Sequence, residues 1–187
     1  MKDKAYIRPP DKIPFYIKLG LMVSKKVTKK DLLVPKLLAW YPKVAISSGV
    51  MESLVAHGKK DLSPRILQLV RMQASILPAC PFCIDMNSFE YDRKNISEEE
   101  ISALAGRIPL EEVTTFTRPE RLAVAYTKLI SETPVMIQES FMAEIKSAFT
   151  EREIVILAST AAQVNYWARL ISALGVPPAG FTDRCDF

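Results

Sequence analysis

Apolar residues recur at helical spacing along most of the chain, and no two neighbouring segments show the alternation typical of paired strands. The segment that begins at Ser63-Pro64 shows the spacing clearly, and its apolar positions are Ile66, Leu67, Leu69, Val70 and Ala74. Proline favours the first turn of a helix, and Pro78 ends the segment. We therefore predict an all-α fold, a compact helical domain without tandem repeats.

Three short motifs mark further helix starts. In a capping box, a hydroxyl and a carboxylate three residues apart satisfy the first free backbone N–H groups of a helix. The three pairs are Ser97 with Glu100, Thr117 with Glu120, and Thr150 with Glu153. We expect the last pair to start a helix over 151–173, because Gly175 and Pro177-Pro178 then stop it.

The chain divides into an N-terminal helical arm over 1–60, a helical core over 61–175 and a C-terminal tail over 176–187, which together form one domain. The arm combines a basic patch with apolar residues: Lys25, Lys26, Lys29, Lys30, Ile13, Phe15, Tyr16, Leu19 and Met22. Such an amphipathic helix either touches anionic lipid or nucleic acid, or packs against the body or a neighbouring subunit. The modest charge density favours packing, and we expect no nucleic-acid partner.

Composition excludes several classes of protein. The 187 residues suffice for one sizeable core, and 49% apolar content with a mean hydropathy of +0.08 excludes disorder. An odd count of three cysteines excludes a secreted disulfide scaffold, and the first residues contain no apolar signal core. No apolar stretch is long enough to cross a bilayer. We expect a cytoplasmic protein of net charge +4 without a membrane span.

The candidate chemistry lies in Cys80-Pro81-Phe82-Cys83, because two thiols at this spacing can close a redox disulfide. Pro81 and the helix-compatible run after Cys83 place the pair where a helix begins. Free backbone N–H groups there stabilise a thiolate, the form that attacks peroxides and disulfides. The same spacing occurs in zinc sites and in inert buried pairs, so these alternatives remain open.

A structural zinc site needs four Cys or His ligands. Apart from the pair, the chain offers only Cys185 and its single histidine, His57. His57 precedes Gly58 and is typical of a solvated residue at a helix end, and we interpret Cys185 as a free thiol in the tail. We therefore expect neither a metal nor a cofactor.

Three segments, taken in order, carry a resemblance to a known superfamily. They are Arg65-Ile66-Leu67-Gln68-Leu69-Val70-Arg71, Cys80-Pro81-Phe82-Cys83-Ile84-Asp85-Met86-Asn87 and Ile96-Ser97-Glu98-Glu99-Glu100-Ile101. Together they resemble the alkylhydroperoxidase D-like branch of the carboxymuconolactone decarboxylase superfamily, mainly over residues 61–105. The segments 120–123 and 164–169 resemble later helices of the same superfamily. The resemblance implies an all-α core and a homo-oligomer.

The resemblance also implies roles for individual residues. Cys83 attacks the hydroperoxide, and Cys80 resolves the resulting sulfenic acid and exchanges electrons with a thiol partner. The family pattern has a glutamate and a histidine, which form a proton relay, at the positions held here by Gln68 and Asn87. Neither amide carries a proton near neutral pH, although both can bind a water or orient a thiol.

Two acidic residues follow Cys83 closely. Glu90 lies at helical spacing from Cys83 through Asn87, so it is a candidate substitute for the relay. About two turns separate Glu90 from Cys83, and a surface carboxylate is the interpretation that this distance favours. Asp85 should point elsewhere, and we interpret it as a charge at the helix N-terminus.

The residues and the resemblance together predict a thiol-dependent, peroxidase-like antioxidant protein. It would reduce hydroperoxides with Cys80 and Cys83, and a thiol or dithiol would supply the electrons. The amides at positions 68 and 87 leave three alternatives: a general thiol–disulfide oxidoreductase, a redox-sensing scaffold, and an enzyme similar to carboxymuconolactone decarboxylase. Thiol–disulfide exchange depends less on a proton relay than peroxide reduction does.

Overall fold

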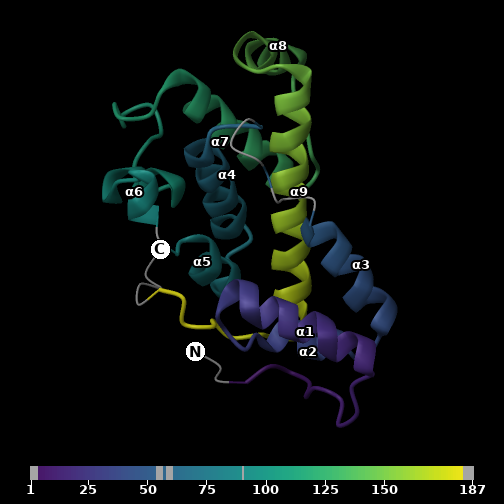
Figure 1. Ribbon diagram of the computed structural model, residues 1–187. Coiled ribbons are helices and arrows are strands. Elements are labelled where there is room, and N and C mark those ends of the chain that lie inside the picture. Colours follow the sequence, from purple (N-terminus) through teal and green to yellow (C-terminus); the bar gives the residue numbers. More distant parts are fainter. Residues whose placement is uncertain (1–3, 54–56, 58–60, 90, 183–187) are drawn as a thin grey trace.

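A computed structural model of the protein describes residues 4–53, 57, 61–89 and 91–182 (Figure 1). The arm contributes α1 (Phe15–Thr28), α2 (Leu33–Leu38) and α3 (Pro42–Ser53). The later elements are α4 (Pro64–Ile76), α5 (Pro81–Asn87), the 3-10 helix η1 (Tyr91–Lys94), α6 (Glu98–Leu104), α7 (Arg118–Ser131), α8 (Glu139–Ala148) and α9 (Glu151–Leu174). Because no described segment is a strand, the all-α prediction is confirmed.

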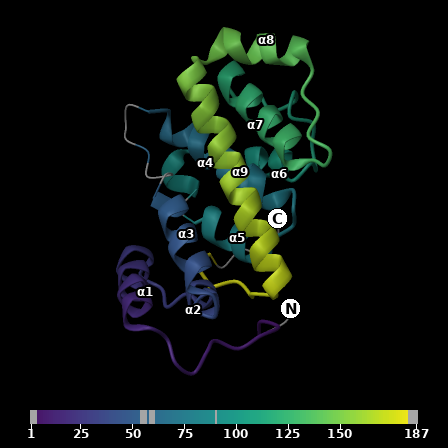
Figure 2. The same ribbon diagram turned by 90° about the vertical axis from the view of Figure 1, so that its right-hand side faces the viewer.

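Helices α4, α7 and α9 pack against one another at the centre, and α9 runs along most of the long axis of the molecule (Figures 1 and 2). With α8 they enclose an apolar cluster that includes Leu67, Val70, Ala123, Ile145 and Leu157. A second cluster, which includes Leu69, Met72 and Leu104, joins α4 to α6 and α7. Burial contributes roughly 1.5–3 kcal/mol for each large apolar side chain, so these clusters fix α4, the helix that supports α5.

The predicted helix starts are confirmed. α4 begins at Pro64, and all three predicted capping boxes close, each with both of its hydrogen bonds. α9 ends at Leu174, one residue beyond the predicted end. Gly175 then adopts a φ of 64°, the left-handed conformation in which glycine ends helices without steric cost.

Arg65 joins two of these capping boxes. Its Nε donates to Oε1 of Glu120 at 2.7 Å, and its Nη2 donates to Oε1 of Glu100. Both carboxylates are buried, and they cap α7 and α6. A single guanidinium on α4 therefore pairs with two buried carboxylates, and these contacts join α4 to the starts of α6 and α7.

The arm and the segment after α9 lie at the end of the core that holds α5. α1, α2 and the last turns of α9 lie at the same end of the molecule in Figures 1 and 2, and the chain after α9 returns to α5. The boundaries expected for arm, core and tail stay a prediction. Among the described helices, none is both long and apolar enough to cross a membrane.

Candidate active site

The cysteine pair lies at the start of α5, as its sequence context indicates. Cys80 is the N-cap residue of this short helix, and Cys83 lies in its first turn. Both are free thiols, with their Sγ atoms 2.7 Å apart. The backbone N–H of Cys83 donates to Sγ of Cys80 at 3.3 Å. The two sulfurs are therefore already neighbours in the reduced form, and closing a disulfide needs only a small shift.

Apolar residues from three parts of the chain cover the pair. Cys80 is fully buried and Cys83 is 3% exposed. The cluster around them includes Val34, Leu37 and Leu38 of α2, Ala168 and Ile171 of α9, and Val176 after α9. The helical arm is thus one wall of the cysteine site. Neither cysteine has more than 3% of its surface exposed to solvent in this arrangement.

The environment shifts the pKa values of the two thiols in opposite directions. The pKa of Cys80 is lowered to about 7, chiefly by the hydrogen bond from the Cys83 thiol and, against the effect of burial, by the backbone N–H of Cys83. The pKa of Cys83 is raised, because its thiol donates to Cys80 and because it is buried. In the reduced pair the negative charge therefore resides on Cys80, whereas the resemblance assigns the attack to Cys83.

The two expected relay positions meet in the structure. Nε2 of Gln68 on α4 donates to the backbone carbonyl of Asn87 on α5. Nδ2 of Asn87 donates to Oγ of Ser75 at 2.9 Å, and that hydroxyl donates to the carbonyl of Arg71 at 2.7 Å. These amides fasten α5 to α4. Glu90, the candidate substitute proton carrier, lies outside the described residues, as does Cys185.

The interpretation of Asp85 as a helix N-terminal charge is wrong. Asp85 is fully buried, and its two carboxylate oxygens accept the backbone N–H groups of Ala179 and Thr182, each at 2.8 Å. A carboxylate offers two acceptor oxygens, so it can hold two donors of an extended segment at once. Asp85 thereby anchors the chain after α9 on α5, and Val176 of that chain belongs to the same apolar cluster as the cysteines.

A cavity of about 190 Å³ lies beside the cysteine motif. It is lined by Lys30 and Asp31, by Leu32 and Leu33, by Phe82, and by Pro177, Pro178 and Ala179. Phe82 stands between the two cysteines in sequence, yet neither cysteine lines the cavity. The cavity has room for a small organic molecule, and Phe82, the neighbour of Cys83 in sequence, is part of its lining.

A polar cluster between α3, α4 and α9 was not predicted. Oε2 of Glu52 accepts from Nε2 of Gln163 at 2.9 Å and from Nε1 of Trp167 at 2.8 Å. Burial lowers the pKa of Arg71, and the charge of Glu52 opposes this shift. Trp167 also packs against the apolar cluster that holds the cysteines. No sequence motif signals this cluster, because its members come from three helices far apart in the chain.

His57 is another correction. It is partly buried, and its Nε2 lies 3.1 Å from Oγ1 of Thr160 on α9. Burial and then the charge of Arg71 lower the pKa of His57. The expected solvated position fails because residue 57 lies against α9, a contact that local sequence does not reveal. Among the described residues, no group of three His, Cys, Asp or Glu side chains is placed to hold a metal.

Comparison with curated protein sequences finds a distant relative. No family model matches the chain. The uncharacterized protein YnjA of Escherichia coli strain K12 is 26% identical over 124 residues. The match covers 65% of this chain and 65% of that relative, slightly less than two thirds of each.

Solved structures are more informative about the fold. An uncharacterized peroxidase-related protein from Silicibacter sp. TM1040 aligns over 98% of this chain and 97% of its own, with a TM-score of 0.79 and 16% identity. A peroxidase-related protein from Ralstonia eutropha JMP134, described as an alkylhydroperoxidase AhpD core, aligns over 99% and 96%, with a TM-score of 0.77 and 12% identity.

A third similar structure is named as a debrominase and not as a peroxidase-related protein. The debrominase Bmp8, solved as a cysteine-to-alanine variant with 2,3,4-tribromopyrrole, aligns over 98% of this chain and 99% of its own, with a TM-score of 0.76 and 14% identity. At these identities the comparisons establish the fold alone. This chain has the alkylhydroperoxidase D-like fold, as its resemblance to that superfamily predicted.

Proposed function

We propose that this protein is a thiol-dependent oxidoreductase that reduces hydroperoxides through the Cys80 and Cys83 pair. The observation that carries the proposal is the pair itself: two free, buried thiols with sulfurs 2.7 Å apart, one of them with a pKa of about 7. Such a pair supplies a thiolate at neutral pH and a second thiol in position to trap the oxidised product.

The reaction proceeds in three balanced steps. A thiolate sulfur attacks the terminal oxygen of the hydroperoxide; the S–O bond forms, the O–O bond breaks, and the alkoxide leaves as an alcohol after it takes up a proton. The second cysteine attacks the sulfenic acid, the S–S bond forms and water leaves. An external thiol or dithiol then reduces the disulfide by exchange and is itself oxidised.

We assign the attack to Cys83 and the resolution to Cys80. In the resting pair the charge is on Cys80, so Cys83 becomes the nucleophile by passing its proton across the 2.7 Å between the sulfurs. This transfer needs no separate base. The amides of Gln68 and Asn87 orient α5 in this scheme, and they carry no proton.

Trapping the sulfenic acid tests both the reaction and the assignment. Reduced protein is mixed with a small organic hydroperoxide and dimedone, and the modified cysteine is located by mass spectrometry. In the Cys80→Ser variant we expect the adduct on Cys83, and in the Cys83→Ser variant we expect peroxide consumption to be lost. An adduct on Cys80 in the Cys83→Ser variant, with none on Cys83 in the Cys80→Ser variant, would reverse the two roles. If the folded wild-type protein forms no disulfide with the hydroperoxide, peroxide reduction is rejected.

A second candidate function is general thiol–disulfide exchange. The specific observation in its favour is that both relay positions hold amides that are already hydrogen-bonded to the protein. Exchange requires a thiolate and an accessible disulfide partner, and it needs no proton relay. Reduction of a protein disulfide by the reduced chain, at a rate above that of hydroperoxide reduction, would favour this function.

The substrate panel should extend beyond hydroperoxides. The cavity beside Phe82 has room for a small organic molecule, and a protein with a similar fold is a debrominase. A halogenated pyrrole therefore belongs in the panel, with a dithiol as the electron donor. We place the reaction in the reducing cytoplasm, where thiol donors are plentiful.

A further inference from the structure

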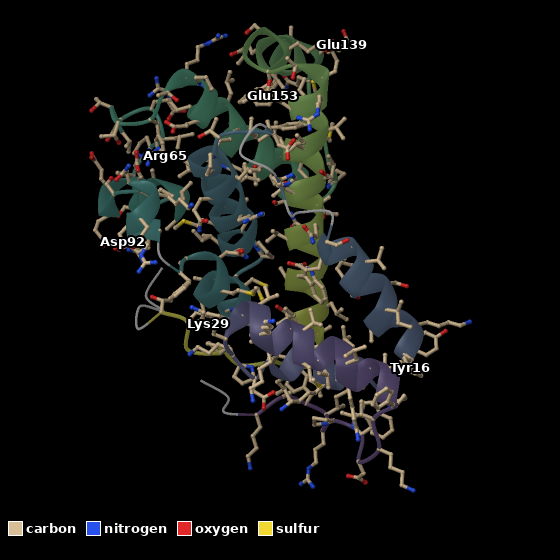
Figure 3. All side chains as sticks on the ribbon, in the orientation of Figure 1. Tyr16, Lys29, Arg65, Asp92, Glu139 and Glu153 are labelled. Carbon is tan, nitrogen blue, oxygen red and sulfur yellow. The ribbon has the colours of Figure 1, made fainter. Side chains whose placement is uncertain are left out.

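The cavity beside Phe82 brings together parts of the chain that lie far apart in sequence. Its lining comes from the loop between α1 and α2, from the start of α2, from Phe82 of α5 and from the chain after α9. Figure 3 labels Lys29, the first residue of that loop, at the end of α1 that lies near α5. The proposed reaction uses none of the lining residues, so what the cavity binds follows from its own walls and charges.

Most of the wall is apolar and suits a ligand of one ring. The apolar lining residues are Leu32, Leu33, Phe82, Pro177, Pro178 and Ala179. The cavity volume of about 190 Å³ exceeds the roughly 150 Å³ of an engineered apolar cavity that binds benzene. A single ring with a short substituent therefore fits, and the walls favour it because binding removes apolar surface from water.

Lys30 supplies a positive charge at one edge of the cavity. This half-buried side chain lines the cavity, and its Nζ donates to the backbone carbonyl of Gly180 at 2.6 Å and lies 5.5 Å from the centre of the Phe181 ring. Gly180 follows the lining residue Ala179, so these contacts hold the ammonium where the chain after α9 passes the cavity. An ammonium has three N–H donors, and the hydrogen bond to Gly180 uses one of them.

The one acidic residue among the lining residues does not cancel this charge. Oδ2 of Asp31 accepts from Nζ of Lys36 at 2.6 Å, and the Asp31 side chain is 59% exposed. Lys36 therefore balances the carboxylate of Asp31 on the solvent side. Among the lining residues that the structure describes, the remaining charge is the ammonium of Lys30, which attracts an anion.

We propose that this cavity is a binding site for a small organic anion. The ring of the ligand lies against Phe82 and the prolines at 177 and 178, and its carboxylate accepts hydrogen bonds from Nζ of Lys30. Apolar walls without the ammonium would take any small ring. The half-buried ammonium selects the ring that carries a negative charge, because a charge-assisted hydrogen bond is stronger than a neutral one.

The cavity shares part of its wall with the cysteine site. Four lining residues also belong to the apolar cluster that buries Cys80 and Cys83, namely Leu32, Leu33, Phe82 and Ala179. An anion in the cavity therefore lies against the walls that cover the sulfurs. That this anion is the organic part of a substrate of the cysteine pair is a step that rests on the proposed function, whereas the binding site itself requires no redox reaction.

Calorimetric titration of benzoate into the reduced full-length protein tests the site. We expect saturable binding to wild type, and Lys30→Met should weaken it by about tenfold or more, the contribution of a hydrogen bond to a charged group. Lys30→Arg retains the charge and should retain most of the affinity. Lys26→Met is the matched control, because it removes an exposed lysine of α1 that is not among the lining residues. Circular dichroism verifies that each variant is folded.

Benzyl alcohol, the neutral counterpart of benzoate, separates the ammonium from the apolar walls. It should bind wild type and Lys30→Met alike, which also shows that the cavity is intact in the variant. Leu32→Trp fills the cavity and should abolish binding of both compounds. Wild type that binds no benzoate would overturn the proposal. Equal loss of benzoate and benzyl alcohol in Lys30→Met would reject Lys30 as the partner of the anion.

Turnover then distinguishes this site from the proposed function. If both hold, benzoate should compete with cumene hydroperoxide, raising KM and leaving kcat unchanged, and Lys30→Met should remove the competition. Benzoate that binds a folded protein without hydroperoxide turnover would support the site and reject the function. Turnover by a protein that binds no benzoate would support the function and reject the site.

Discussion

The side-chain amide of Gln68 on α4 donates a hydrogen bond to the backbone carbonyl of Asn87 on α5, so the two positions of the expected proton relay are in direct contact. The fold thus brings together the positions that the resemblance pairs, but it brings two amides together. An amide pair holds α5 in place and carries no proton near neutral pH, so the proposed reaction leaves proton transfer to the cysteines themselves. Hydroperoxide turnover should therefore be slower with these two amides than with a glutamate and a histidine at the same positions.

Restoring the relay should measure this rate. Gln68→Glu combined with Asn87→His places a carboxylate and an imidazole where the resemblance has them. General acid–base help contributes on the order of 10²–10⁴-fold, so we expect hydroperoxide turnover with a dithiol donor to rise by at least the lower figure. The control is the same pair of substitutions with Cys83→Ser, which should abolish the gain. No gain in the folded double variant would mean that the surrounding pocket does not support peroxide chemistry.

The reduced pair should titrate near neutrality. Because the pKa of Cys80 is about 7, its thiolate fraction grows as pH rises through 7, and so should its rate of alkylation by iodoacetamide. Replacing Cys83 by alanine removes the thiol that contributes most to the lowered pKa, so the midpoint should move up towards the ordinary value of 9.0. Cys185→Ser in both proteins removes the competing thiol. A midpoint unchanged by Cys83→Ala would contradict the assigned charge on Cys80.

Asp85 should anchor the chain that follows α9. Asp85→Ala leaves the N–H groups of Ala179 and Thr182 without their acceptor, and an unsatisfied buried group costs about 1–3 kcal/mol. We expect a lower free energy of unfolding in urea together with faster alkylation of Cys80, because Val176 of the loosened segment belongs to the apolar cluster that buries the pair. Asp92→Ala, at an exposed position, is the control and should change neither quantity. Equal alkylation rates in both variants would argue against a covering role.

Arg65 should matter for stability and leave the cysteine chemistry intact. Arg65→Ala removes the guanidinium that pairs with both Glu100 and Glu120, and breaking a buried pair costs about 3–5 kcal/mol. Unfolding in urea should show this loss, and Lys128→Ala at an exposed position of α7 should show almost none. Adding Glu100→Gln and Glu120→Gln to Arg65→Ala should recover part of the stability, since no buried charge then lacks a partner. If the loss is below about 1 kcal/mol, solvent already screens the pair.

The sequence by itself determined the starts of α4, α6, α7 and α9 and the cysteine motif at the start of α5. Capping boxes and the proline at the start of α4 act through hydrogen bonds and dihedral angles within a few residues, so local sequence contains the information to place them. The same holds for the cysteine spacing at the start of α5. The resemblance added the fold, because the three segments that carry it lie in order along the chain.

Only the tertiary structure decided what surrounds the pair. Asp85 anchors a segment more than ninety residues away, and Glu52 receives its hydrogen bonds from α9. Burial of both cysteines under α2 likewise depends on contacts between distant parts of the chain. Side-chain burial and charge pairing are set by which helices meet, and one-dimensional spacing does not contain that information. The motif therefore predicted a redox pair, and the fold set its charge, its cover and its access.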